Sequence, residues 1–198
     1  MSAVPYDLPG DPELAHEMAA QATSTGETWV TAIDDPHLPI HYPTVNLTHT
    51  LQRNERWISV SVAQTGETED FLALGRVISA AVAATDRRVV VLASGGMSHR
   101  FFPLRTIRDH ETTAPENVIS TDAYEADQRV ISHLERGDHQ AVISQMDSYR
   151  RHAPEGRFGH YLAMAGALGG PACTSKATRY SDYEAAVGTG QIHLWFDL

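Results

Sequence analysis

The chain has 198 residues, of which 42% are hydrophobic and 20% charged, a composition typical of one globular domain. Its formal net charge of −10 disfavours contact with nucleic-acid phosphates or anionic lipid, so we expect neither nucleic acid nor a membrane among its partners. The single cysteine cannot form an internal disulfide, and no stretch has the roughly 20 apolar residues that a bilayer span needs. We therefore expect a soluble protein of the cytoplasm.

Helix and strand signals alternate along the chain. In chain order the expected elements are a helix at 12–23, a strand at 28–33, a helical turn at 45–51, a strand at 56–63, a helix at 68–84, a strand at 88–93, helices at 122–135, 139–149 and 158–168, and closing strands at 177–183 and 191–196. Asp11 and Pro12 suit the cap and first position of the first helix.

The almost wholly apolar run at 88–93 is typical of a strand buried on both faces of a sheet. Together with the strand at 56–63 and the helix between them, it predicts a βαβ unit with parallel strands. The predicted fold class is therefore α/β, a layered αβα domain around a mixed, largely parallel sheet, with residues 1–198 forming a single domain.

The segment that follows the run at 88–93 is the best candidate for chemistry. Gly95 and Gly96 let the backbone turn tightly or approach a ligand closely, and Ser98 and His99 follow after Met97. Ligands of α/β sheets bind beyond the carboxyl ends of the strands, where these residues are expected. A histidine with an ordinary pKa of about 6.5 suits general acid–base work.

Simpler interpretations of the same segment stay open. A Gly-Gly pair after a strand is common in ordinary turns. The pattern is neither the G-x-S-x-G nucleophile elbow nor a phosphate-binding loop, and the absence of the elbow argues against an unrelated α/β hydrolase.

Four segments together resemble the class III, LigB-type extradiol ring-cleavage dioxygenases, and in particular the homoprotocatechuate 2,3-dioxygenase branch. They are PGDPELAHEMA at 9–19, PIHYPTVNL at 39–47, SGGMSHRF at 94–101 and VGTGQIHLWF at 187–196. The resemblance implies an oxidoreductase of aromatic catabolism that opens a catechol-type aromatic acid with Fe(II) and O2. It also implies that the chain lacks the N-terminal portion of the family fold.

Matched to the family, His99 takes the place of the catalytic histidine that accepts a proton from the catechol and later returns one. Tyr42 matches a second position that hydrogen-bonds substrate or oxygen, although a half-buried loop tyrosine is an equally good interpretation. We also expect Ser98 and His41 at the substrate, where His41 replaces an acidic residue that is common in the family. Arg100 and Arg105 lie just beyond the loop and are candidates to pair a substrate carboxylate, because a guanidinium suits bidentate recognition.

The implied iron site is a 2-His-1-carboxylate triad, which leaves positions open for catecholate and O2. Both histidine ligands fall in the N-terminal portion that the chain is expected to lack. Glu155 is the best match to the carboxylate, with Glu184 a poorer one and a simple helix-start charge as the alternative. We expect His133 and His139 to be solvated. The ligand set is thus incomplete, and Fe(II) binding is in doubt.

Two functions follow from the resemblance. One is an extradiol dioxygenase, or the C-terminal portion of one, that acts on a small aromatic substrate and O2. The other is a non-catalytic partner subunit of the same fold, or a protein that binds a small aromatic ligand. Because a sheet without its first strands exposes edges and apolar surface, we expect a homo-oligomer or a partner chain that supplies the missing part.

Overall fold

The computed structural model describes residues 8–35, 42–111 and 120–197, except for the side chain of Tyr42. These residues form two compact units: unit 1 comprises residues 1–61 and 77–90, and unit 2 comprises residues 62–76 and 91–198. Among the described helices, none is long and apolar enough to cross a membrane.

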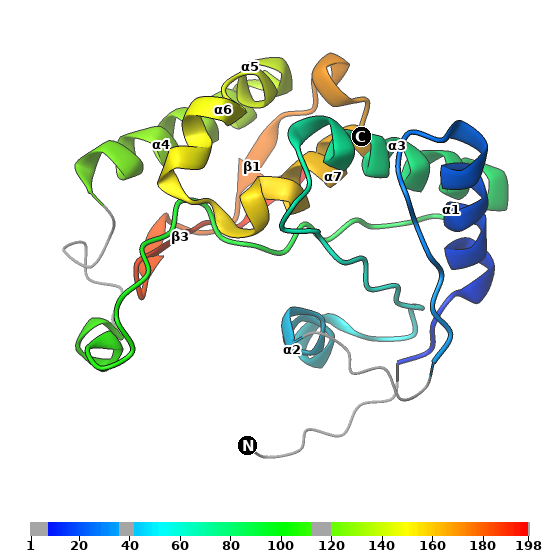
Figure 1. The fold of residues 1–198 in the computed structure, drawn as a ribbon, viewed down its shortest axis with the longest axis horizontal. Coiled ribbons are helices and arrows are strands. Elements are labelled where there is room, and N and C mark those ends of the chain that lie inside the picture. Colours follow the sequence, from blue (N-terminus) through cyan, green and yellow to red (C-terminus); the bar gives the residue numbers. More distant parts are fainter. Residues whose placement is uncertain (1–7, 36–41, 112–119, 198) are drawn as a thin grey trace. The chain divides into compact units, whose positions relative to one another are not determined.

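The described part of the chain is mixed helix and strand (Figure 1). The α-helices are α1 Pro12–Thr25, α2 Tyr42–Leu51, α3 Thr68–Thr85, α4 Thr121–Arg136, α5 His139–Ser144, α6 Met146–Tyr149 and α7 Gly159–Ala167. The 3-10 helices are η1 Ile107–His110, η3 Arg150–His152, η4 Glu155–Phe158 and η5 Gly170–Ala172. The strands are β1 Ala177–Arg179, β2 Glu184–Ala186, β3 Thr189–Gln191 and β4 Leu194–Phe196.

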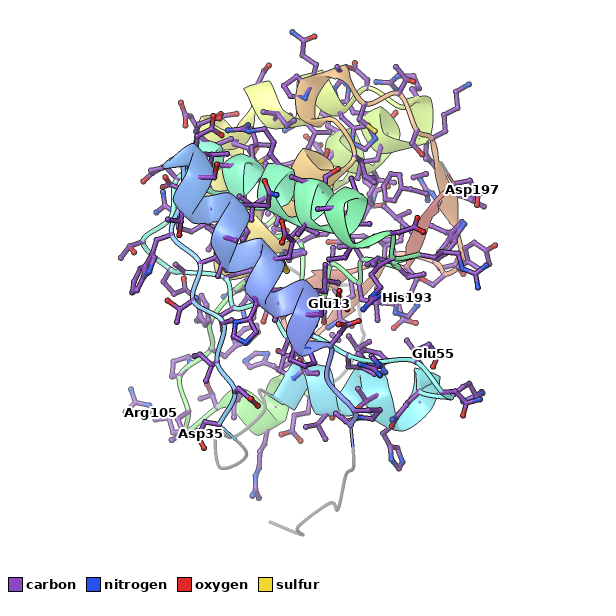
Figure 2. All side chains as sticks on the ribbon, turned by 90° about the vertical axis from the view of Figure 1, so that its right-hand side faces the viewer. Glu13, Asp35, Glu55, Arg105, His193 and Asp197 are labelled. Carbon is purple, nitrogen blue, oxygen red and sulfur yellow. The ribbon has the colours of Figure 1, made fainter. Side chains whose placement is uncertain are left out.

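Unit 1 is built around α1 and the second half of α3. Asp11 caps α1 as predicted, because its carboxylate accepts a hydrogen bond from the Leu14 amide at 3.2 Å. Glu13 lies in the first turn of the same helix (Figure 2), where a negative charge is favourable. Both carboxylates pair with Arg87. The apolar cluster of this unit consists of Leu14, Met18, Ala22, Val77 and Ala81.

Unit 2 holds the larger core. The first half of α3 contributes Phe71 and Leu72, and α4, α5, α6 and α7 supply most of the remaining buried side chains. The predicted helices at 68–84, 122–135 and 158–168 are confirmed, while the one at 139–149 is divided at Gln145 into α5 and α6.

The described sheets are two small antiparallel pairs, both in unit 2. β1 pairs with β4, with Ala177 opposite Phe196, and β2 pairs with β3, with Ala186 opposite Thr189. The closing strands predicted near 177 and 191 therefore form, but shorter than expected and with a hairpin between them.

Three predicted strands, at 28–33, 56–63 and 88–93, belong to no sheet among the described residues. The run at 88–93 is also not buried: Val89, Val90 and Leu92 are 40%, 64% and 42% exposed. A strand needs a neighbouring backbone to receive its hydrogen bonds, and the described chain offers none here. The predicted burial of 88–93 is therefore wrong for this chain, and the parallel sheet is not formed in its described part.

Candidate active site

The segment at 94–101 lies against the β2–β3 hairpin. The Met97 amide donates to the Gly190 carbonyl at 2.8 Å, the Gly190 amide donates to the Ser98 carbonyl at 2.9 Å, and the Arg100 amide donates to the Gly188 carbonyl at 2.8 Å. His99 and Thr189 form an isolated antiparallel bridge. These bonds give residues 97–100 the geometry of a short strand, whose successive side chains point to opposite sides.

His99 is half-buried on one side of this short strand. Its Nδ1 lies 3.0 Å from the Thr189 hydroxyl, and its ring stacks on Phe101 with 4.2 Å between the ring centroids. Burial lowers the pKa of His99 below its usual 6.5, and the negative charge of Glu155 opposes this shift. The imidazole is therefore neutral at pH 7 and can accept a proton.

Ser98 lies on the opposite side and is fully buried. Its hydroxyl donates to Asp127 Oδ2 at 2.5 Å, and its amide donates to Asp127 Oδ1 at 3.2 Å. The side chain has no exposed surface for the substrate contact that we expected of it. Its observed contact fixes the backbone next to His99.

The Gly95–Gly96 turn is flanked by two groups from 155–160. Glu155 Oε2 accepts a hydrogen bond from the Gly96 amide at 2.6 Å, and the Glu155 amide donates to the Gly96 carbonyl at 3.3 Å. His160, on α7, packs so closely against Gly95 that a Cβ there would overlap its ring. Burial lowers the pKa of His160 to about 4, so this ring is neutral as well.

The described residues do not complete an iron site. Glu155 and two histidines surround the turn, yet no group of three or more His, Cys, Asp or Glu side chains in the described residues is arranged to hold a metal ion. Glu155 already accepts a hydrogen bond from a main-chain amide. The donor set of the described chain therefore does not fit the Fe(II) triad that the resemblance implies.

The remaining predicted residues divide into three cases. His41 lies outside the described residues, and Tyr42 begins α2 with its side chain outside them. Arg100 is exposed, with its guanidinium 4.9 Å from the centre of the Phe102 ring. No described substrate contact tests its assignment.

The expectation that His139 is solvated is wrong. His139 is fully buried, with Nδ1 at 3.0 Å from the Tyr161 hydroxyl and Nε2 at 2.8 Å from the Ser175 carbonyl. Neutral partners hold this ring in the core of unit 2. His133 is half-buried and lies 3.1 Å from the carboxylate of Asp138.

Asp127 and Thr189 are site residues that the sequence analysis missed. The burial of Asp127 was predictable from the sequence, because Asp127 falls on the apolar stripe of the predicted helix at 122–135, between Ala123 and Ile131 at helical spacing. A carboxylate on such a stripe must be buried with hydrogen-bond partners. Thr189 gave no comparable signal, since its contact with His99 depends on the pairing of distant segments.

A family model described as "Catalytic LigB subunit of aromatic ring-opening dioxygenase" matches residues 1–192. The chain belongs to the LigB family. The match extends across both units, and it confirms the resemblance that the four sequence segments carry.

Two relatives of this LigB-family chain are named as dioxygenases. The chain is 26% identical to the 2-aminophenol 1,6-dioxygenase alpha subunit of a Pseudomonas species, over 98% of its own length and 70% of that protein. It is 27% identical to the 3,4-dihydroxyphenylacetate 2,3-dioxygenase of Escherichia coli, over 83% of its own length and 59% of that protein. The chain thus spans only part of the length of these relatives.

Proposed function

We propose that this LigB-family chain is a subunit of an extradiol ring-opening dioxygenase that acts on a catechol-type aromatic acid, with His99 as its acid–base residue. The observation that carries the proposal is the state of His99: a half-buried imidazole with a lowered pKa, fixed at Nδ1 by Thr189. The names of the family and of both relatives support ring cleavage as the reaction.

In the proposed reaction, His99 accepts the proton of a substrate hydroxyl as O2 reacts with the aromatic ring. The O–H bond of the substrate breaks, a new N–H bond forms on the imidazole, and the same proton returns to the ring-opened product. Because Nδ1 is the nitrogen closer to Thr189, we assign the transferred proton to Nε2. Arg100 and Tyr42 are the candidates for substrate contacts, with a guanidinium suited to a substrate carboxylate.

Ring opening of this kind uses Fe(II) and O2, and the described residues do not hold the metal by themselves. We propose that iron ligands come from residues outside the described ones, either in this polypeptide or in a partner chain. Glu155, close to His99, is the carboxylate best placed to join them, at the expense of its bond to Gly96.

A partner is also supported by the run at 88–93. The side chains of Val89, Val90 and Leu92 are exposed, and the backbone of the run has no sheet partner among the described residues. This combination favours pairing with a strand of another chain. The Pseudomonas relative is named as an alpha subunit. We propose that a homo-oligomer or a second subunit completes the layered, largely parallel sheet, and that the assembly works in the cytoplasm.

The incomplete donor set favours a second candidate, a non-catalytic LigB-fold subunit or a small-aromatic-ligand protein. An anaerobic Fe(II) titration of the purified assembly separates the two, followed by catechol-dependent O2 uptake. The proposed dioxygenase binds iron near one equivalent per active site and consumes O2 with formation of a ring-opened product. Binding of a catechol without iron and without O2 uptake would contradict it and support the second candidate.

A further inference from the structure

Asp127 is a buried carboxylate whose hydrogen-bond partners are all neutral. It lies on α4 with no exposed surface. Oδ1 accepts from the Ser98 amide at 3.2 Å and from the Tyr149 hydroxyl at 2.8 Å, and Oδ2 accepts from the Ser98 hydroxyl at 2.5 Å and from the Tyr183 hydroxyl at 2.6 Å. Each carboxylate oxygen of Asp127 thus accepts two hydrogen bonds from the protein itself.

Burying this carboxylate is costly, because no water solvates it. Burial raises the pKa of Asp127 above its usual value, although all four hydrogen bonds act to lower it. Burial also raises the pKa of Tyr149 and of Tyr183, with the charge of Asp127 adding to the effect, so both phenols stay protonated and keep donating. A simple core position would be filled at lower cost by an apolar side chain.

Two of the four bonds of Asp127 go to Ser98, the residue directly before His99. Since adjacent side chains of a strand point to opposite sides, holding Ser98 inward directs His99 outward, toward Thr189 and Phe101. Asp127, with its hydrogen bonds to Ser98, Tyr149 and Tyr183, therefore acts on the backbone from which the imidazole projects.

Gly190, on the β2–β3 hairpin, packs closely against Asp127 and Tyr183. A Cβ on this residue would overlap Asp127 Oδ2 and the Tyr183 hydroxyl. The Gly190 carbonyl also accepts a hydrogen bond from the Met97 amide, and the Gly190 amide donates one to the Ser98 carbonyl. The absence of a side chain at 190 thus lets the hairpin approach both the carboxylate and the short strand that carries His99.

We infer that Asp127 is a positioning residue that, through Ser98 and with the help of Tyr149 and Tyr183, sets the orientation of the His99 imidazole. Its consequence for ring opening rests on the proposed function, whereas the orientation of His99 is measurable in the absence of any reaction. The two parts are therefore tested separately.

The direct test is nuclear magnetic resonance of the protein with ¹⁵N-labelled histidine. Loss of one signal in His99→Gln assigns His99 among the 11 histidines of the chain. The titration midpoint and the tautomer of that ring are then compared in the wild type, Asp127→Ala, Asp127→Asn and Ser98→Ala. Tyr161→Phe is the matched control, because it removes a buried hydroxyl in the same unit whose described side-chain hydrogen bond goes to His139 and not to Asp127 or Ser98.

Asp127→Ala is expected to raise the His99 midpoint toward the ordinary value of about 6.5 and to change its tautomer balance, because the ring loses its fixed, half-buried position. Ser98→Ala, which keeps the amide bond, is expected to give a smaller change of the same kind. Asp127→Asn is expected to stay close to the wild type, since its amide oxygen can still accept and its amide nitrogen can donate to Ser98 and Tyr183. Tyr161→Phe should leave the signal unchanged.

In an assembly that opens rings, Asp127→Ala should lower kcat by roughly 10²-fold with little change in KM, as expected for a misplaced acid–base group, and Asp127→Asn should restore most of kcat. If Asp127→Ala does not fold, the His99 signal is compared between the wild type, Ser98→Ala and Tyr183→Phe instead. An unchanged His99 signal in folded Asp127→Ala, or in Ser98→Ala and Tyr183→Phe where Asp127→Ala does not fold, overturns the inference, as does an equal shift in Tyr161→Phe. A wild-type assembly without ring opening refutes the proposed function and leaves the His99 comparison intact.

Discussion

The Thr189 hydroxyl lies 3.0 Å from His99 Nδ1, and the two residues form an antiparallel bridge between segments 90 positions apart in the sequence. The same hydroxyl is 3.5 Å from Nε2, so Nδ1 is the nitrogen that it engages more closely, and in the proposed reaction Nε2 is left for the transferred proton. Thr189→Val removes the hydroxyl with little change in shape. We expect roughly fivefold slower ring opening, from the loss of about 1 kcal/mol of hydrogen bonding.

Thr189→Ser is the control for this variant, because it keeps the hydroxyl. In steady-state O2 uptake at saturating catechol, the rate of Thr189→Ser should be close to that of the wild type, and the rate of Thr189→Val should be well below it. Equal rates for the two variants would remove the hydroxyl from the account.

The pH dependence of ring opening should reflect the lowered pKa of His99. Since only the neutral imidazole accepts a proton, kcat/KM should rise with pH through the pKa of His99 and level off above it. The midpoint of this acidic limb is expected below the ordinary 6.5, because burial disfavours the protonated ring. A rate profile that lacks this limb in the wild type, or keeps it in His99→Gln, would contradict the assignment.

The stability of unit 2 should depend on pH through His160. Its folded pKa of about 4 lies below the unfolded value of about 6.5, so the unfolded chain binds more protons between these values. The contribution of His160 to the free energy of unfolding is therefore fully present above pH 6.5 and lost as the pH falls toward 4. Urea unfolding at several pH values should show a weaker dependence in His160→Gln, and parallel curves for both proteins would refute this.

Helix α1 should lose stability when its cap is removed. Asp11→Ala removes both the bond to the Leu14 amide and the ion pair with Arg87, and should cost about 1 kcal/mol or more. Asp11→Asn keeps a capping oxygen and removes only the charge, so it should cost less. Chemical denaturation of both variants measures the difference, and equal losses would mean that the ion pair outweighs the cap.

The helices were predictable because their signals are local. The cap at Asp11, the acidic first turn of α3 and the apolar stripe of α4 lie within a few residues of each other in the sequence, and α1, α3, α4 and α7 appear close to their expected bounds. The run at 88–93 shows the limit of this reasoning. Its residues have the composition of a buried strand, but burial and pairing depend on another backbone that no local pattern supplies.

The candidate site divides in the same way. The motif from Ser94 to Phe101 identifies His99 and the Gly-Gly turn, both of which lie at the site. The contact with the His99 ring comes from Thr189, and the contacts with the neighbouring Ser98 come from Asp127, both of which are remote in sequence. The short strand turns the Ser98 side chain inward. A motif names the residues of a site, while the pairing of distant segments determines which way each side chain points.

If the exposed run at 88–93 pairs with a neighbouring chain, one charged side chain placed in it should weaken the assembly. Val90→Lys places a cation on a side chain that is 64% exposed in the described chain, so the isolated subunit should fold as before. Light scattering should show a smaller particle than the wild type, because the charge opposes strand pairing with a neighbour. Leu104→Lys, at an even more exposed leucine elsewhere on the chain, is the control and should leave the assembly unchanged. Identical masses for all three proteins would exclude this segment as the contact.

The acid–base role of His99 is tested most directly by the rate of ring opening in His99→Ala, measured at saturating catechol and O2 with bound Fe(II) matched to the wild type. We expect a fall in kcat of roughly 10²–10⁴-fold, the usual contribution of a general acid–base residue. A His99→Ala enzyme that opens the ring as fast as the wild type would contradict it.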